Sequence, residues 1–133
     1  MKGNNNYTIY DNFEKALATL NRFLSYDIVN DRDRAGIIQG FEFTFECCWK
    51  TLQKLAKLEN FEVKSPRESI IKGMELGVFD FSDEEILIKM MLDRNLTSHI
   101  YEESMSIEIC NRIQNQYYPL LEKCLTNIKE FIK

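Results

Sequence analysis

The sequence predicts an all-α protein, an antiparallel up-and-down bundle of four or five helices. Glycine and proline occupy only 5 and 2 of the 133 positions, which is too few for a protein rich in tight turns. Apolar residues recur at intervals of three and four, and helix-start signals stand directly before these segments. The length suits a single folding unit, so we expect residues 1–133 to form one helical-bundle domain.

Each expected helix carries an apolar stripe, and most open with a capping signal. The expected boundaries are Asp11 to between Ser25 and Asn30, about Asp33 to Leu58, Ser65 to about Gly77, Ser82 to at least Asp93, and about Ser104 to Phe131. Pro119 lies inside the last of these helices. Because proline has no backbone N–H, we expect a kink near Asn115.

The second expected helix carries more apolar residues than one stripe requires. Phe43, Cys47 and Trp49 are the surplus. A helix with so wide an apolar face is either central in the bundle or buried at a dimer interface. The four cysteines of the chain have no CxxC spacing, and we expect them to be reduced and mostly buried.

Composition and missing motifs exclude several classes of protein. The formal charge is −4, so nucleic acid would have to bind at a local basic site. No segment reaches the roughly 20 apolar residues of a membrane-spanning helix, and we expect a cytoplasmic protein without membrane contact. His99 is the only histidine and there is no Gly-rich phosphate loop, so we expect neither a metal nor a cofactor. Asp31 and Asp33 are spaced like a magnesium-binding pair, but we interpret them as the acidic start of a helix.

Hydrogen-bonding side chains are concentrated at positions 94–101, which read R-N-L-T-S-H-I-Y. On a continuous helix Arg94 and His99 lie on adjacent faces; they converge if the helix ends between them or if a second subunit contributes its own copy. A guanidinium that binds phosphate and an imidazole that exchanges protons near neutral pH suit work on a phosphodiester. Alternatively, Arg94 pairs with Asp93 or Glu102 on a solvated face, and the other groups pack at a helix end.

Three segments, in this order, resemble a known family of helical proteins. The pattern R-x4-H-x-Y at 94–101 is similar to the signature of the HEPN superfamily. Together with F-E-F-T-F-E-C-C-W-K at 41–50 and S-P-R-E at 65–68, it resembles the branch called nucleotidyltransferase substrate-binding proteins. The resemblance extends roughly from residue 13 to residue 128. Glu46 and Lys50, which lie one turn apart in the first segment, are expected to form a structural ion pair.

The resemblance implies a homodimeric helical bundle in complex with a cognate minimal nucleotidyltransferase. In one description the dimer is a metal-independent ribonuclease toxin, in which His99 is the general acid or base and Arg94 stabilises charge at phosphorus. The transferase then acts as antitoxin by adding AMP to Tyr101, and Asn95 and Ser98 are candidate orienting groups. In the alternative description the chain is a non-catalytic subunit that binds RNA or a nucleotide for the transferase.

Overall fold

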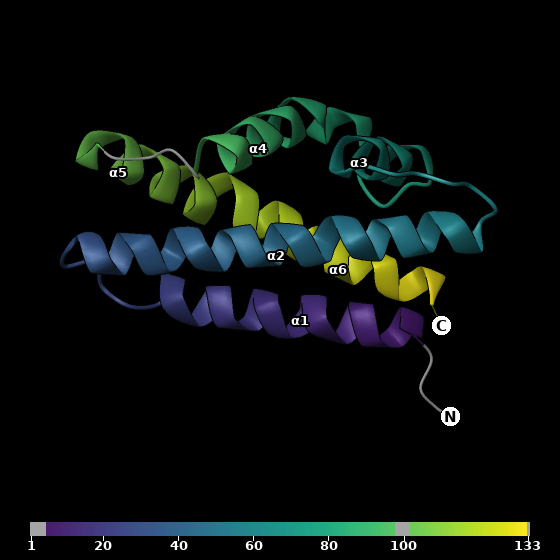
Figure 1. The fold of residues 1–133 in the computed structure, drawn as a ribbon, viewed down its shortest axis with the longest axis horizontal. Helices are drawn as coiled ribbons and strands as arrows, with labels where there is room; N and C mark the ends of the chain where they lie inside the picture. Colours follow the sequence, from purple (N-terminus) through teal and green to yellow (C-terminus); the bar gives the residue numbers. More distant parts are fainter. Residues whose placement is uncertain (1–4, 98–101, 133) are drawn as a thin grey trace.

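The computed structural model describes residues 5–97 and 102–132 of the chain. Its elements are α1 (Asn5–Leu24), α2 (Asp31–Leu58), α3 (Pro66–Glu75), the short 3-10 helix η1 (Phe81–Asp83), α4 (Glu84–Leu96), α5 (Glu103–Arg112), the π-helical turn η3 (Ile113–Tyr117) and α6 (Tyr118–Phe131). Figure 1 shows α1 and α2 side by side and antiparallel, with α4 running back above them and α5 to α6 returning. The described residues contain no strand. The predicted all-α, up-and-down bundle is therefore confirmed.

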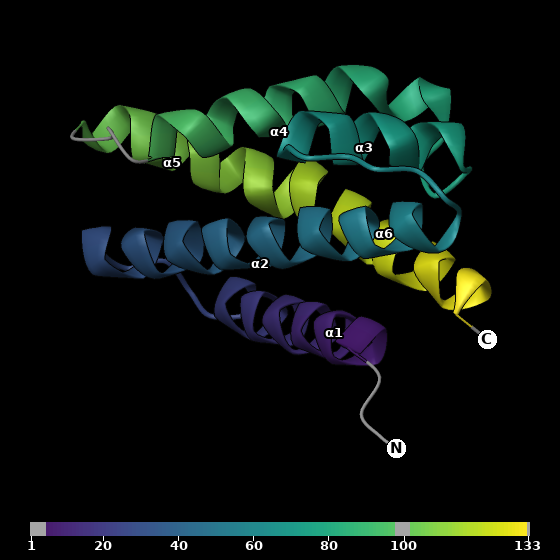
Figure 2. The ribbon, with the colours of Figure 1, turned by 45° about the vertical axis from the view of Figure 1, so that its right-hand side comes forward.

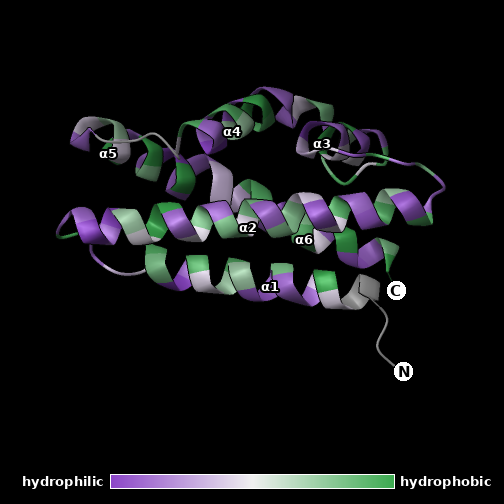
Figure 3. Ribbon diagram, in the orientation of Figure 1, coloured by the Kyte–Doolittle hydropathy of each residue, from purple (hydrophilic) through white to green (hydrophobic). Residues whose placement is uncertain are grey.

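Helix α2 is the centre of the bundle. It contacts α1, α3, α5 and α6, and Figure 2 shows it between α1 on one side and α3 and α5 on the other, with α6 behind. Polar and apolar residues alternate around α1 and α2 in Figure 3, as expected for helices with one buried face. On α2 the buried set includes Phe41, Phe45 and Cys48, whereas Phe43 is 60% exposed. The wide apolar face predicted from the sequence thus reflects a central position, and Phe43 is left uncovered.

The first helix begins earlier than its sequence predicts. The capping pattern predicts a start at Asp11, but α1 begins at Asn5. The additional turns are stabilised by tertiary contact, because Tyr10 is buried and the Thr51 hydroxyl of α2 donates to the carbonyl oxygen of Ile9 at 3.4 Å. A local capping pattern was therefore overridden by packing between helices.

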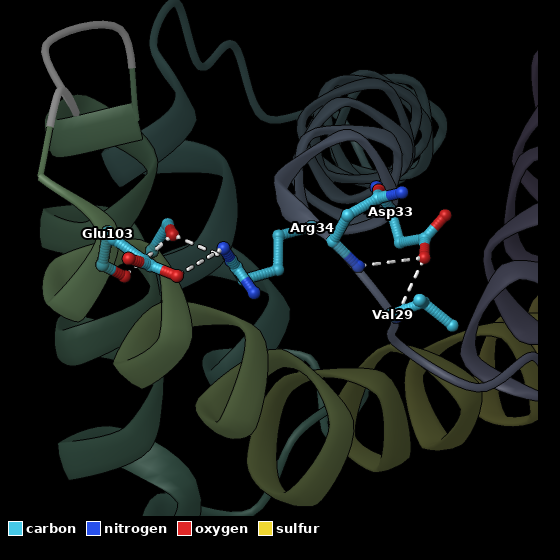
Figure 4. Close-up of polar contacts among 6 residues, drawn as sticks. Val29, Asp33, Arg34 and Glu103 are labelled. Atoms are coloured by element: carbon cyan, nitrogen blue, oxygen red, sulfur yellow. Dashed lines mark hydrogen bonds and ion pairs between the residues drawn. The ribbon is translucent and has the colours of Figure 1, made fainter.

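Helix α2 also begins slightly earlier than predicted, at Asp31. Asn30 is its N-cap: the Asn30 side chain accepts from the Asp33 backbone N–H at 3.1 Å. The Asp33 carboxylate accepts in return from the N–H of Asn30 at 3.2 Å and from the N–H of Val29 at 2.8 Å. Figure 4 labels Asp33 and Val29. This capping box confirms that the paired aspartates form the acidic start of a helix.

The predicted start and end of α3 are confirmed, whereas the predicted start of α4 is wrong by two residues. The Ser65 hydroxyl accepts from the Glu68 N–H at 3.1 Å, and Gly77 stops the helix with a φ of 87°, a conformation that favours glycine. The predicted start of the fourth helix at Ser82 falls within η1. There the Asp83 carboxylate accepts from the Asp80 N–H at 3.0 Å, so the effective cap precedes the predicted one.

The last helix is interrupted where Pro119 predicts it. Residues 113–117 form a π-helical turn between α5 and α6. Because Pro119 cannot donate a backbone hydrogen bond to the preceding turn, the chain takes up an extra residue there. The turn places Tyr117 in the core, where its ring stacks on Phe41 with centroids 5.5 Å apart.

All four cysteines are free and buried, as predicted. Burial raises the pKa of the Cys110 thiol to about 11, so this thiol stays protonated and unreactive at neutral pH. Among the described helices, none combines the length and apolarity needed to cross a membrane.

Candidate functional site

Arg94 lies in the last turn of α4 and faces α2. Its Nη1 is 3.3 Å from Oε2 of Glu42. The Thr97 hydroxyl donates to the same carboxylate oxygen at 2.6 Å, so both residues fix the end of α4 against α2. The alternative interpretation, in which Arg94 pairs with Asp93 or Glu102, is therefore wrong about the partner. The partner lies 52 positions earlier in the chain, and its proximity depends on how the two helices pack.

Asp93, next to Arg94, is buried, and its side chain binds residues of α5 and η3 and not α2. Its carboxylate accepts from Arg112 Nε at 2.6 Å and Nη2 at 3.0 Å, and also from the Tyr117 hydroxyl. Asp93 is only 1% exposed. Its hydrogen bond raises the pKa of Arg112, and burial together with the same carboxylate raises the pKa of Tyr117. The buried ion pair thus connects α4 to α5 and η3.

The structural role of Asp93 was not predicted, although the sequence carries one signal for it. Leu87, Met90 and Asp93 are the buried residues of α4 and follow one another at intervals of three. A carboxylate on such an apolar stripe must have a buried partner, because an isolated charge is costly to bury. The identity of that partner does not follow from the spacing.

The described residues on either side of the stretch 98–101 bind α2. Ser98, His99 and Tyr101 lie in the stretch 98–101, outside the described residues. Before it, Thr97 binds Glu42; after it, Glu103 Oε1 accepts from Arg34 Nη2 at 3.1 Å, as shown in Figure 4. Arg34 Nε also donates to the Ser106 hydroxyl in α5, at 3.2 Å. Glu42 and Arg34 are eight residues apart on α2, so they are separated by about 12 Å along the helix.

Arg94 and Asn95, two of the predicted site residues, line the same hollow of about 390 Å³. Its other lining residues are Phe45, Glu46, Ser65, Pro66, Arg67, Ile88, Met91 and Leu92. The Arg94 side chain is 30% exposed, so it can reach a ligand in this hollow. The ion pair predicted for Glu46 is confirmed, with its carboxylate 3.6 Å from the Lys50 amino group.

The charges around this hollow favour an anion. Arg94 and Arg67 supply two guanidinium groups against one carboxylate, that of Glu46, and the hollow is also lined by Ser65 and Pro66 at the N-terminus of α3, where the helix dipole gives partial positive charge. Arginine binds phosphate through two parallel hydrogen bonds. In residues 5–97 and 102–132, no group of three or more metal-ligating side chains lies close enough to hold a metal ion.

Comparison with known proteins agrees with this architecture. Residues 8–130 match the family described as nucleotidyltransferase substrate binding protein like. The chain belongs to this family. A crystal structure from Thermus thermophilus is similar to this family member at 34% identity and a TM-score of 0.81, over 88% of this chain and 98% of that chain. No curated protein sequence matches.

Two solved toxin–antitoxin structures share the fold of this family member. One is MntA–HpeT, with 13% identity, a TM-score of 0.77, and coverage of 94% of this chain and 97% of that chain. The other is a tri-AMPylated HEPN toxin of Shewanella oneidensis in complex with MNT antitoxin, with 14% identity, a TM-score of 0.76, and coverage of 97% and 99%. The predicted family and its HEPN-type helical fold are confirmed.

Proposed function

We propose that this family member is the helical partner of a minimal nucleotidyltransferase and that its homodimer is a metal-independent ribonuclease. The observation that carries the proposal is the hollow beside Arg94. A partly exposed guanidinium, a second arginine and a helix N-terminus line it, and a histidine follows Arg94 five positions later. Such a set supplies a phosphate-binding group and a proton-transfer group within one short segment.

The proposed reaction needs no group beyond these side chains. His99 takes the proton of a ribose 2′-hydroxyl, and the oxygen attacks the adjacent phosphorus. Arg94 binds the non-bridging oxygens and stabilises their growing negative charge. The bond from phosphorus to the 5′-oxygen breaks, and an imidazolium returns a proton to that oxygen. The products are a 2′,3′-cyclic phosphate and a 5′-hydroxyl end.

An uncovered apolar surface beside Arg94 supports the homodimer in this proposal. Ile88, Leu92 and Leu96 follow at intervals of four on α4 and are 42%, 56% and 45% exposed. Phe43, next to Glu42 on α2, is 60% exposed. An exposed apolar row such as the one on α4 is typical of interfaces. A second copy covering this surface would bring two Arg94 side chains to one cleft.

The experiment that tests the proposal is RNA cleavage in excess EDTA. The purified protein, shown by mass spectrometry to carry no AMP, is incubated with a single-stranded RNA and with a DNA of the same sequence. We expect the RNA to be cut to cyclic-phosphate ends and the DNA, which lacks the 2′-hydroxyl, to remain intact. Intact RNA after prolonged incubation would contradict the ribonuclease.

Tyr101 is proposed as the acceptor of AMP from the partner transferase. Tyr101→Phe removes the phenolic oxygen that would be adenylylated, and we therefore expect no AMP to be transferred to this variant. The measurement is mass spectrometry of the chain after incubation with ATP and a co-expressed minimal nucleotidyltransferase. Tyr26→Phe is the matched control, because Tyr26 is 58% exposed and lies outside the R-x4-H-x-Y pattern. Persistent modification of Tyr101→Phe would assign the acceptor to another residue.

A second candidate is a non-catalytic subunit that binds RNA or a nucleotide for the transferase. The specific observation in its favour is the Glu42 carboxylate, which already neutralises Arg94 at 3.3 Å. The description of the matching family also refers to substrate binding. This candidate predicts that the RNA binds and is not cut in the EDTA experiment.

A further inference from the structure

A second hollow, of about 600 Å³, lies at the C-terminal end of α2 and is lined by positive charge. Its lining includes one glutamate and four lysines, which are Lys50, Lys54, Lys57 and Lys64. The whole chain has a net charge of −4. This hollow, hereafter the lysine groove, is therefore a local basic site on an otherwise acidic protein.

Two of these lysines have charges that are not used within the described structure. Lys54 and Lys57 lie on one face of α2, and no carboxylate of residues 5–97 or 102–132 is within ion-pair distance of either. Lys64 is 3.4 Å from Glu62, but both side chains are more than three-quarters exposed, so this pair is weak. Lys57 lies in the last turn of α2, where the negative end of the helix dipole favours a positive charge. Lys54 lies about one turn earlier, where this effect is smaller.

The floor of the lysine groove is held in one shape by backbone hydrogen bonds. Asn60 adopts a left-handed conformation, with φ 69°, and turns the chain back so that the Phe61 N–H donates to the Ala56 carbonyl at 2.8 Å. The Gln53 side chain donates to the Val63 carbonyl at 3.0 Å. The groove is thus preformed, which lowers the entropic cost of binding a ligand.

An exposed aromatic ring lies beside the lysines. Phe61 lines the groove and is 45% exposed. The amino group of Lys72 is 3.8 Å from the centroid of its ring, which restrains the ring from one side. A restrained, exposed aromatic ring among cations can stack a nucleobase while the cations bind the neighbouring phosphates.

The lysine groove adjoins the hollow beside Arg94. Glu46 lines the hollow beside Arg94 and Lys50 lines the lysine groove, and these two residues form an ion pair at 3.6 Å. Lys64 lines the groove and Ser65, the next residue, lines the Arg94 hollow. Along α2 the two hollows together extend from residue 45 to residue 57, about 18 Å. That length accommodates a few nucleotides.

We infer that the lysine groove binds the backbone of single-stranded RNA next to the phosphodiester held at Arg94. This inference rests on the proposed function, because it takes RNA as the ligand. Lys54 and Lys57 contact phosphates, and Phe61 stacks one base. A single strand is the ligand because its unpaired bases expose the faces that an aromatic ring needs, whereas a duplex stacks them internally.

The test is binding of a fluorescent 2′-deoxy oligonucleotide, which cannot be cut through a 2′-hydroxyl, to the full-length protein. Lys54→Gln combined with Lys57→Gln is expected to raise the Kd at least tenfold at low salt. The slope of log Kd against log salt should fall by about 1.4, since each phosphate contact on a single strand contributes about 0.7. Phe61→Leu is expected to weaken binding at least about fivefold through lost stacking.

The matched control is Lys15→Gln combined with Lys129→Gln, which removes the same charge from two lysines of α1 and α6 that do not line the groove. Its Kd should change less than twofold. Equal losses in both double variants, or an unchanged Kd in the Lys54 and Lys57 variant, would overturn the inference. If the lysine variant binds more weakly but the unmodified protein does not cut RNA, only the ribonuclease is contradicted. If the protein cuts RNA but the lysine variant binds as tightly as the unmodified protein, only the groove is contradicted.

Discussion

Replacing Arg94 with glutamine is expected to slow metal-free RNA cleavage by about 10²- to 10³-fold, the usual cost of removing one group that stabilises transition-state charge. Glutamine keeps much of the length of the side chain but cannot neutralise a phosphate. Arg94 is the one charged residue of the R-x4-H-x-Y pattern within the described structure, and it lines the hollow. The measurement is the rate of RNA cleavage in EDTA at saturating RNA.

Two further variants make this expectation specific. His99→Ala should also reduce the rate by about 10²- to 10⁴-fold, as loss of a general acid or base does. Glu42→Gln should act in the opposite direction on binding and lower the Kd for RNA about two- to fivefold, because a partly exposed carboxylate no longer competes with phosphate for Arg94. Cleavage that is equal in Arg94→Gln and the unmodified protein would indicate a contaminating nuclease.

Replacing Asp93 with alanine is expected to lower the free energy of unfolding by about 3 kcal/mol. Breaking a buried ion pair by removing one partner leaves the other without compensation, and typically costs about 3–5 kcal/mol. The value should lie at the lower end because the Arg112 side chain is 25% exposed and can reach water, whereas the buried Tyr117 hydroxyl cannot. Urea unfolding followed by circular dichroism, at one fixed protein concentration, measures the change.

The control for this prediction is Asp80→Ala, which removes one partner of an exposed pair. Asp80 is 2.7 Å from the Lys123 amino group and its side chain is 68% exposed. Lys123 keeps a second carboxylate, that of Asp83, also at 2.7 Å. We expect a loss below about 1 kcal/mol. An equally small loss in Asp93→Ala would show that the buried pair contributes little to stability.

Much of the fold and part of the candidate site could be predicted from local sequence. The capping serine before α3, the left-handed glycine after it and the proline in the last helix act on neighbouring backbone atoms, so their effects can be read from a few adjacent residues. The segment 94–101 also singled out Arg94 and Asn95 as candidates, and both line one hollow. The family predicted from the three segments is confirmed.

The partners of these residues could not be predicted in this way. Glu42 binds Arg94 from 52 positions away, and Arg34 binds Glu103 from 69 positions away. The sequence by itself determined which segments are helical, their order and the pattern at 94–101, whereas packing against α2 set the start of α1. Only the tertiary structure decided that Asp93 is buried against Arg112, and that the lysine groove adjoins the hollow at Arg94. The physical reason is that helix formation depends on neighbours within four residues, whereas ion pairs between helices depend on how whole helices pack.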